Sequence, residues 1–311
     1  MIEIVKGAIF GLVVADALGV CVEFESRKKL QKNPVDKMLG YGSHNVPKGT
    51  WSDDTSMVLC TLNSIAQKGK IDLVDNVLEF SKWAENGYMT PHGEVFDIGI
   101  TTLTSLRNYW KSKNVYTCGG KSDYDNGNGS LMRIIPVSLY NHFKNLSKKE
   151  SIRNVHEVSA LTHAHERSLI ACGIYDFIVR ELIKSPEKSS VISALKKADK
   201  YYSDYKEIKH YKRIFDEKFI DTDSSLIKSS GYVVDTLEAV IWCLLNTDSY
   251  KDCVLKAVNL GEDTDTVAAV AGGLAGILYG YDSIPKEWIN TLVKSDMISK
   301  LCDKFVKGIS W

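Results

Sequence analysis

Apolar residues recur every three or four positions along most of this chain, and strict alternation of apolar and polar residues is rare. This spacing is typical of α-helices with one buried face. Only 6 prolines are present to interrupt it. The predicted helices cover residues 2–20, 71–85, 95–112, 130–143, 148–160, 165–184, 187–202, 232–246, 249–259, 267–279, 285–293 and 296–308, and one more follows Ser52 and ends near Gln67.

Two polar stretches, residues 25–50 and 203–229, lack a regular pattern and are predicted to be long connections. A further polar loop is predicted over residues 123–129. The sequence has no internal repeat of fixed period and no shift in composition that would mark a linker. We therefore predict a single all-α domain over residues 1–311, although a length of 311 residues alone would suggest about two domains.

Small residues are concentrated in the helices predicted at 2–20 and 267–279. Glycine and alanine side chains allow helix backbones to approach one another closely. We therefore expect these two segments, which lie at opposite ends of the chain, to pack against each other.

Composition adds little evidence for a macromolecular partner. Lys and Arg total 39, as do Asp and Glu, so nucleic acid is not indicated. The seven cysteines are scattered without a CxxC pair, which favours reduced thiols in a cytoplasmic protein. Glu3 and Asp16 interrupt the apolar N-terminus, so we expect neither a signal peptide nor a membrane-spanning helix. We also expect a monomer.

Two acidic clusters precede apolar helices: Ser52-Asp53-Asp54-Thr55 and Asp263-Thr264-Asp265-Thr266. Each cluster alone is explained as a helix N-cap beside a solvated carboxylate. Neither has a Lys or Arg within three residues, and together they offer four carboxylates and at least two hydroxyls. Such an all-oxygen set favours a hard cation over zinc. Four carboxylates are enough for a pair of ions.

A glycine-containing loop precedes the helix predicted from Ser130. Its sequence, Asn126 to Arg133, predicts either a phosphate cradle or an ordinary capped turn. His163, in a Thr-His-Ala-His-Glu run, either contacts a ligand phosphate or is a partly buried histidine at a helix start.

Three further carboxylates, Asp16, Glu23 and Asp97, can each be interpreted in two ways. Asp16 and Glu23 stand in an apolar segment, so each has a partner or a raised pKa, or else faces solvent. Asp97 is either functional or a simple cap for the following helix.

In order and spacing, the short motifs of this chain resemble those of the ADP-ribosylglycohydrolase family. The matching segments are Ala15-Asp16-Ala17-Leu18-Gly19, Glu23-Phe24, Trp51 to Met57, Phe96-Asp97-Ile98-Gly99, Asn128 to Arg133, Thr162-His163, Gly231 to Thr236, and Gly261 to Thr266.

The resemblance implies an all-α, orthogonally packed fold with a central cleft that holds two Mg²⁺ or Mn²⁺ ions. By matching position, Glu23 is an acid near the metals and Asp97 handles the scissile group, with Asp54 and Asp263 also part of the catalytic set. The implied metal ligands are Ser52, Asp53, Asp54, Asp263, Asp265 and Thr266. The implied ADP-ribose contacts are Asn128, Gly129, Ser130, Met132, Arg133, His163 and Tyr232, with adenine stacking on Tyr232.

Three residues depart from the family pattern. Ala15 replaces the usual Gly, Ser52 replaces the common Thr and keeps its hydroxyl, and Glu262 stands where Gly or Asp is usual. None of these changes removes an implied metal ligand.

The resemblance implies a metal-dependent hydrolase that cleaves the bond between ADP-ribose and an acceptor and releases ADP-ribose. Two alternatives are a non-catalytic ADP-ribose-binding protein and a two-metal nucleotide phosphohydrolase. The acceptor, the preferred anomer and the choice between Mg²⁺ and Mn²⁺ are not encoded in any motif that we can interpret.

Overall fold

The computed structural model describes residues 1–310. It is 67% helical, and it contains no β-strand within those residues, which confirms the predicted all-α class. The α-helices are α1 Ile2–Gly19, α2 Arg27–Lys32, α3 Asp53–Lys68, α4 Leu73–Asn86, α5 Ile100–Ser112, α6 Ile135–Phe143, α7 Lys148–Ala160, α8 Glu166–Lys184, α9 Lys188–Tyr202, α10 Lys212–Phe215, α11 Val233–Leu245, α12 Tyr250–Val258, α13 Thr264–Tyr279, α14 Lys286–Thr291 and α15 Ser295–Ile309.

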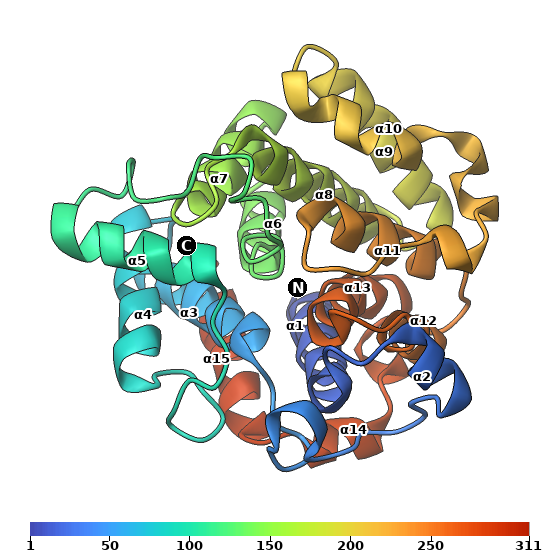
Figure 1. Cartoon of the computed structure of the whole chain (residues 1–311). Coiled ribbons are helices and arrows are strands. Elements are labelled where there is room, and N and C mark those ends of the chain that lie inside the picture. Colours follow the sequence, from blue (N-terminus) through green and yellow to red (C-terminus); the bar gives the residue numbers. More distant parts are fainter. Residues whose placement is uncertain (311) are drawn as a thin grey trace.

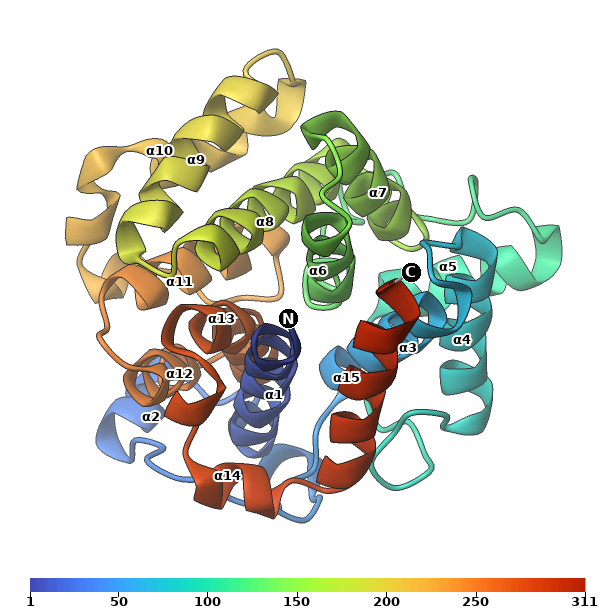
Figure 2. The same cartoon turned by 180° about the vertical axis from the view of Figure 1, so that it is seen from behind.

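Helices α1 and α13 lie side by side in the middle of the molecule, and the other helices surround them (Figures 1 and 2). Nearly every residue of both helices is buried. Their backbones touch where Gly11 faces Gly272, since a Cβ built on Gly11 would lie 2.4 Å from the Gly272 carbonyl oxygen. The predicted pairing of the two small-residue helices is therefore confirmed, and it closes the fold by joining the two ends of the chain.

The residues from Ile2 to Val22 are long and apolar enough, by length and composition alone, to cross a membrane, contrary to our expectation. However, 89% of this segment is buried inside the protein. It is covered by α13, α15 and α12, so here it forms the core of the helical assembly.

The outer helices follow the predicted order, with two displaced starts. Helix α5 begins at Ile100 rather than at 95, because the chain stays extended through Gly99. Helix α6 begins at Ile135 rather than at 130, and Pro136 occupies its first turn, a position that proline favours. The predicted loops 25–50 and 203–229 contain the short helices α2 and α10.

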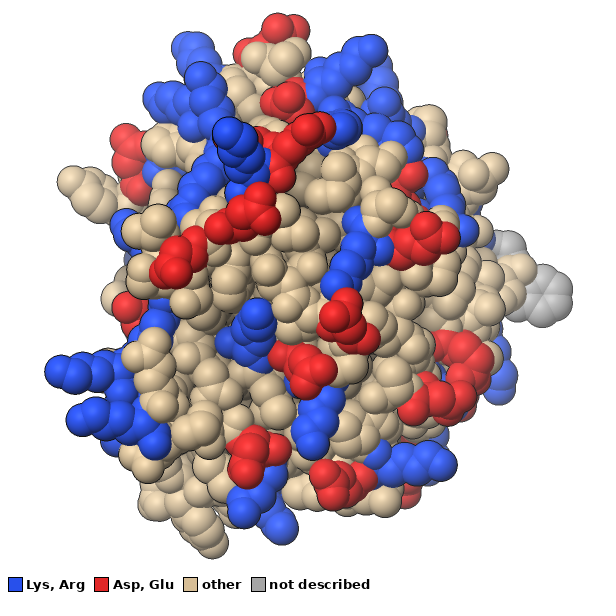
Figure 3. Space-filling view, turned by 90° about the vertical axis from the view of Figure 1, so that its right-hand side faces the viewer, with Lys and Arg blue, Asp and Glu red and all other residues tan. Residues whose placement is uncertain are grey.

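Acidic and basic side chains alternate over the face drawn in Figure 3, without a large area of one sign. This distribution agrees with the equal numbers of acidic and basic residues in the sequence.

Candidate metal and substrate site

The start of α3 is fixed by a carboxylate that comes from α1. Asp16 is fully buried and accepts hydrogen bonds from the backbone N–H groups of Ser52, at 3.0 Å, and Thr55, at 3.1 Å. The Thr55 hydroxyl also donates to Asp16, at 2.5 Å. Of the two readings of Asp16, the structure supports a partnered, buried carboxylate. Burial raises its pKa to about 6, although these hydrogen bonds oppose that shift.

The two acidic clusters meet although some 200 residues separate them. The Thr266 hydroxyl at the start of α13 donates to Asp54 Oδ2 at 3.3 Å, and the Ser52 hydroxyl donates to the same oxygen at 3.0 Å. Oxygen atoms of Glu23, Asp263 and Asp265 lie within 4.8 Å of one another. The paired helix starts therefore gather carboxylates and hydroxyls at one place.

This cluster has too much negative charge for its surroundings. Burial raises the pKa of Asp53, Asp54 and Asp265 well above the usual range, and neighbouring carboxylates raise each pKa further. Within residues 1–310, the buried oxygens Asp54 Oδ1 and Asp263 Oδ1 have no hydrogen-bond partner.

An unpartnered, buried carboxylate oxygen is costly unless a cation binds it. The candidate ligand atoms are all hard oxygen atoms, which suit a divalent cation such as Mg²⁺ or Mn²⁺. The residues gathered here thus fit a metal site, and the six ligands implied by the resemblance all lie in the two helix starts: Ser52, Asp53, Asp54, Asp263, Asp265 and Thr266.

Glu23 lies beside the cluster and forms an ion pair with His44 Nε2. Burial raises the pKa of Glu23 to about 7, despite the hydrogen bond from His44, and Asp97 and Asp263 add to the rise. The same bond raises the pKa of His44. Sequence reasoning missed His44, because it lies in the irregular 25–50 stretch without a spacing signal; the only hint was its residue type.

A cleft of about 310 Å³ opens next to the carboxylates. Asp97 lines it and does not cap α5, whose N-cap is Gly99. Asn128 joins the cleft to the cluster, because its amide donates to Asp263 Oδ2 at 2.7 Å and to Thr236 Oγ1 at 3.0 Å. The predicted site residues that line this cleft are Glu23, Asp53, Asp97, Asn128, Gly129, Met132, His163, Asp263 and Thr266.

Ser130 and Arg133 are not among the residues that line the cleft. Both are fully buried, and Ser130 accepts a hydrogen bond from Ser159 at 2.8 Å instead of capping a helix. The Arg133 guanidinium lies over the Phe80 ring and donates to Thr162 Oγ1 at 2.8 Å. Their side chains therefore support the loop from behind.

Arg133 and His163 share a hydrogen-bond partner. Thr162 Oγ1 accepts from the Arg133 guanidinium and is also hydrogen-bonded to His163 Nδ1, 2.7 Å away. Burial lowers the pKa of His163 to about 3, and Arg133 lowers it further. The His163 ring is therefore neutral, and it lines the cleft.

Tyr232 lies at the edge of the same region. A backbone bridge joins it to Gly127, and its ring packs with the Arg167 guanidinium at 5.8 Å. Tyr232 is partly exposed but does not line the cleft itself.

The model of the family described as ADP-ribosylglycohydrolase matches residues 2–311. The chain belongs to the ADP-ribosylglycohydrolase family. The predicted activity, hydrolysis of a glycosidic bond to ADP-ribose, is confirmed at the level of this family.

Curated relatives agree with the family match. The chain is 35% identical over 305 residues to the ADP-ribosylarginine hydrolase Tri1 of Serratia proteamaculans (strain 568), covering 96% of this chain and 78% of that protein. It is 32% identical over 290 residues to the ADP-ribosyl-[dinitrogen reductase] glycohydrolase of Rhodospirillum rubrum, covering 92% and 89%. A solved ADP-ribosylglycohydrolase-related protein complex superposes with a TM-score of 0.82 at 27% identity, covering 99% of this chain and 98% of that one.

The structure explains where the unusual Glu262 of this ADP-ribosylglycohydrolase points. Glu262 has a left-handed backbone with φ of 62°, a conformation that favours Gly, Asn or Asp. Its N–H donates to the Glu25 carbonyl at 2.8 Å, and its carbonyl accepts from the Phe24 N–H at 2.7 Å. The Glu262 side chain is exposed, so its charge is not part of the buried acidic cluster.

Proposed function

We propose that this ADP-ribosylglycohydrolase uses two divalent cations to hydrolyse the N-glycosidic bond between ADP-ribose and an arginine side chain. The observation that carries the proposal is the joining of two acidic helix starts, through Ser52, Asp54 and Thr266, beside a cleft. The arginine acceptor is supported by the names of relatives, which include ADP-ribosylarginine hydrolases at 35% and 31% identity.

In this proposal the cations are held by Ser52, Asp53, Asp54, Asp263, Asp265 and Thr266. Bound there, Mg²⁺ or Mn²⁺ would supply Lewis acidity and lower the pKa of a water molecule. The Ser52 and Thr266 hydroxyls and the Asp16 contacts keep the Asp54 carboxylate in place. Asn128 does the same for Asp263.

The cleft loops would orient ADP-ribose. The Asn128-Gly129 backbone approaches the ligand, Met132 lies beside it, and neutral His163 hydrogen-bonds to the ligand. Tyr232 offers a partly exposed ring to the adenine. Arg133 contributes indirectly, by holding Thr162, whose hydroxyl is hydrogen-bonded to His163.

Glu23 and Asp97 are the groups that would move protons. Cleavage at the anomeric carbon passes through a transition state with positive charge on the ribose, and nearby carboxylates favour that charge. A pKa of about 7 lets Glu23 accept a proton from water and return it near neutral pH. The ion pair with His44 holds the Glu23 carboxylate in position.

The test is a panel of defined conjugates, in which ADP-ribose is attached to arginine or to serine in one peptide. Each is assayed with Mg²⁺, with Mn²⁺ and with EDTA, and products are identified by mass spectrometry. We expect intact ADP-ribose from the arginine peptide with either metal and none with EDTA. AMP or free phosphate as product would identify a phosphohydrolase, and tight ADP-ribose binding without turnover would identify a binding protein; either result would contradict the proposal.

A further inference from the structure

Exposed apolar side chains are gathered at the mouth of the cleft. Within residues 1–310, three of the four most exposed large apolar side chains line it: Phe24, Ile100 and Tyr124. The fourth, Tyr116, does not line the cleft. Contiguous apolar surface that the described chain leaves uncovered often marks a binding surface. The mouth of the cleft therefore offers apolar contacts to whatever molecule extends out of it.

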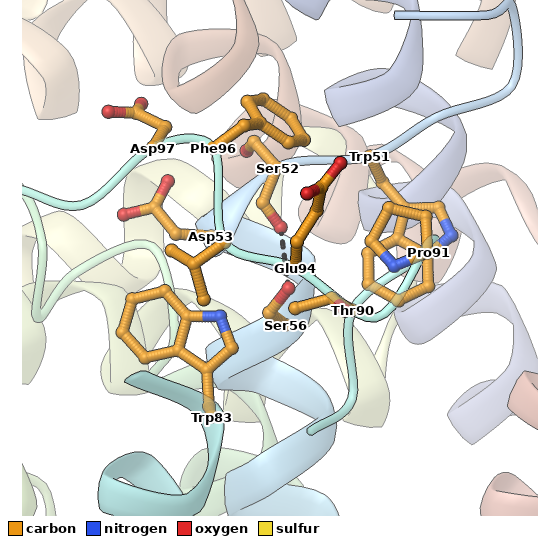
Figure 4. A pocket seen from close by; sticks show the side chains of 11 residues that line it. Trp51, Ser52, Asp53, Ser56, Trp83, Thr90, Pro91, Glu94, Phe96 and Asp97 are labelled. Carbon is orange, nitrogen blue, oxygen red and sulfur yellow. Dashed lines mark hydrogen bonds between the residues drawn. The ribbon is translucent and has the colours of Figure 1, made fainter. Parts of the chain in front are cut away.

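Phe24 and Ile100 lie at the end of the cleft where the bond would break. Phe24 directly follows Glu23, and Ile100 comes three residues after Asp97, on the chain that leads into α5. Figure 4 shows Asp97 on this chain, near Asp53 at the start of α3. In the proposed function Glu23 and Asp97 move protons at the reacting bond. The two apolar side chains therefore stand beside the exit from that bond to solvent.

Phe24 is held in a conformation that its residue type disfavours. Its backbone φ of 66° lies in the left-handed region, which strains a residue with a bulky side chain. Two hydrogen bonds fix this conformation, because the Phe24 N–H donates to the Glu262 carbonyl at 2.7 Å and the Glu262 N–H donates to the Glu25 carbonyl at 2.8 Å. The Phe24 ring packs against His44, with 5.8 Å between ring centroids, yet 71% of the residue is exposed. Asparagine would suit both this backbone and the solvent better, so folding alone does not explain a phenylalanine here.

Ile100 is equally unusual for its position. It is the first residue of α5 and is 86% exposed. The first turn of a helix favours acidic residues or proline, and a β-branched side chain lowers helix propensity slightly. Helix α5 has no acidic residue in its first turn and no side-chain cap. The Ile100 side chain therefore adds little to the stability of α5 and is available for contact at the cleft mouth.

The molecule that extends out of the cleft follows from the proposed function. An arginine side chain belongs to a polypeptide and is only a few atoms long, so the polypeptide backbone must pass just outside the cleft, beside the reacting bond. Apolar side chains next to the modified arginine would cover Phe24 and Ile100 and remove their apolar surface from water. We propose that Phe24 and Ile100 form a docking lip for the modified polypeptide, which favours apolar residues on either side of the ADP-ribosylated arginine. The proposal rests on the proposed function, which supplies the arginine.

Binding is tested by calorimetry, with the Mg²⁺-loaded protein and conjugates that it cannot hydrolyse. Each conjugate contains a carbocyclic analogue of ADP-ribose, in which a methylene group replaces the ring oxygen of the distal ribose. This change removes the oxygen that stabilises the cationic transition state. The analogue is attached to free arginine, to an arginine between two leucines in a peptide, or to an arginine between two serines. We expect the parent protein to bind the leucine peptide about tenfold more tightly than the other two conjugates.

Variants of the docking lip should affect one conjugate selectively. Phe24→Asn and Ile100→Ser should each weaken binding of the leucine peptide about fivefold, and should change the affinity for the other two conjugates less than twofold. Tyr116→Ser is the matched control, because Tyr116 is 74% exposed and lies outside the cleft, and it should bind all three conjugates as the parent does. Phe24→Asn should also raise the melting temperature, since asparagine tolerates the left-handed backbone. If Phe24→Asn is less stable than the parent, Ile100→Ser decides the question.

Three results would overturn the docking lip. The first is equal affinity of the parent for the leucine and serine peptides. The second is equal weakening of all three conjugates in both variants, which would mean that the two side chains contact ADP-ribose or support Glu23 instead. The third is a dimer of this chain, seen in sedimentation, that dissociates in both variants, because a second copy would then cover the lip.

Failure of the proposed function gives a different result. If ADP-ribose is released from the serine-linked peptide and not from the arginine-linked peptide, the acceptor of the proposed function is wrong. The same leucine and serine neighbours, placed around a serine that carries the analogue, then decide whether the lip binds polypeptide. Tighter binding with leucine neighbours would support the lip, and equal binding would overturn it.

Discussion

The starts of helices α3 and α13 each carry two carboxylates and two hydroxyls, but the protein holds the two starts differently. The α3 start is capped by its own Ser52 and is fastened to α1 by Asp16. Asp263, at the α13 start, makes no side-chain cap and is held by Asn128 from the cleft loop. One half of the site is therefore set by the core, and the other half is linked to the residues that would meet the ligand.

The largest effect is expected when either half loses a carboxylate. Asp54→Asn and Asp263→Asn should each lower ADP-ribose release by at least about 1000-fold, because the metal site loses charge and a ligand. Initial rates with Mn²⁺ would measure the loss. Thermal unfolding of the metal-free variants is the control and should show no destabilisation, since each change removes a buried, unpaired charge. Full activity in either variant would disprove the shared site.

Asp16 and Asn128, which hold the starts of α3 and α13, should differ in how much they contribute to the free energy of unfolding. Asp16→Asn should lower the free energy of unfolding by about 2–3 kcal/mol, because an amide oxygen cannot replace both carboxylate oxygens and its NH₂ would face donors. Asn128→Ala should cost about 1 kcal/mol and should mainly weaken ADP-ribose binding. Urea unfolding and calorimetry measure the two quantities, with exposed Asp36→Asn as the control. An equal loss of unfolding free energy in Asp16→Asn and Asn128→Ala would contradict the proposed difference between the two helix starts.

The buried carboxylates predict an unusual pH dependence for the metal-free protein. Their pKa values are raised in the folded state, so the folded state binds more protons and the free energy of unfolding falls as pH rises. Between pH 6.5 and 8, Glu23 alone, with a pKa of about 7, accounts for about 1 kcal/mol.

His163 does not oppose this trend in the same window. Its lowered pKa costs stability only below about pH 6.5, the pKa of histidine in the unfolded chain. Urea unfolding at pH 6.5 and 8, with and without Mn²⁺, tests the prediction. Addition of Mn²⁺ should restore the free energy of unfolding that is lost at pH 8. A metal-free protein that is more stable at pH 8 than at pH 6.5 would contradict the view that the buried carboxylates destabilise the fold when they ionise.

The smallest effect concerns the loop before α13. Glu262→Asn should stabilise the protein by about 0.5–1 kcal/mol, because asparagine tolerates the left-handed backbone at this position. Activity should stay unchanged, since the Glu262 side chain is exposed. A change in metal preference would mean that its charge reaches the site after all. Thermal unfolding and the Mg²⁺ to Mn²⁺ activity ratio are the measurements.

Much of this architecture could be predicted from the sequence because its signals are local. Apolar spacing predicted the helices, and the glycines of α1 and α13 predicted their contact. The start of α6 was missed although Pro136 marks it, because the glycines and Ser130 gave a competing start signal. Whether the side chain of Arg133 faces the cleft or the core depends on its packing against Phe80 of α4 and Thr162 after α7, which no local pattern encodes.

The site itself was predictable only in part. The acidic motifs and the family resemblance identified the carboxylates, but not their anchors. The contacts of Asp16 with Ser52 and Thr55 span 36 and 39 residues, and the pairing of His44 with Glu23 starts from a stretch with no periodicity.

The most direct test of the shared metal site is a calorimetric titration of metal-stripped protein with Mn²⁺ at pH 8. We predict saturable binding of two ions per chain, and fewer ions or much weaker binding in Asp54→Asn and in Asp263→Asn alike. An absence of saturable binding, or a loss in one variant with no change in the other, would show that the two acidic helix starts do not form one site.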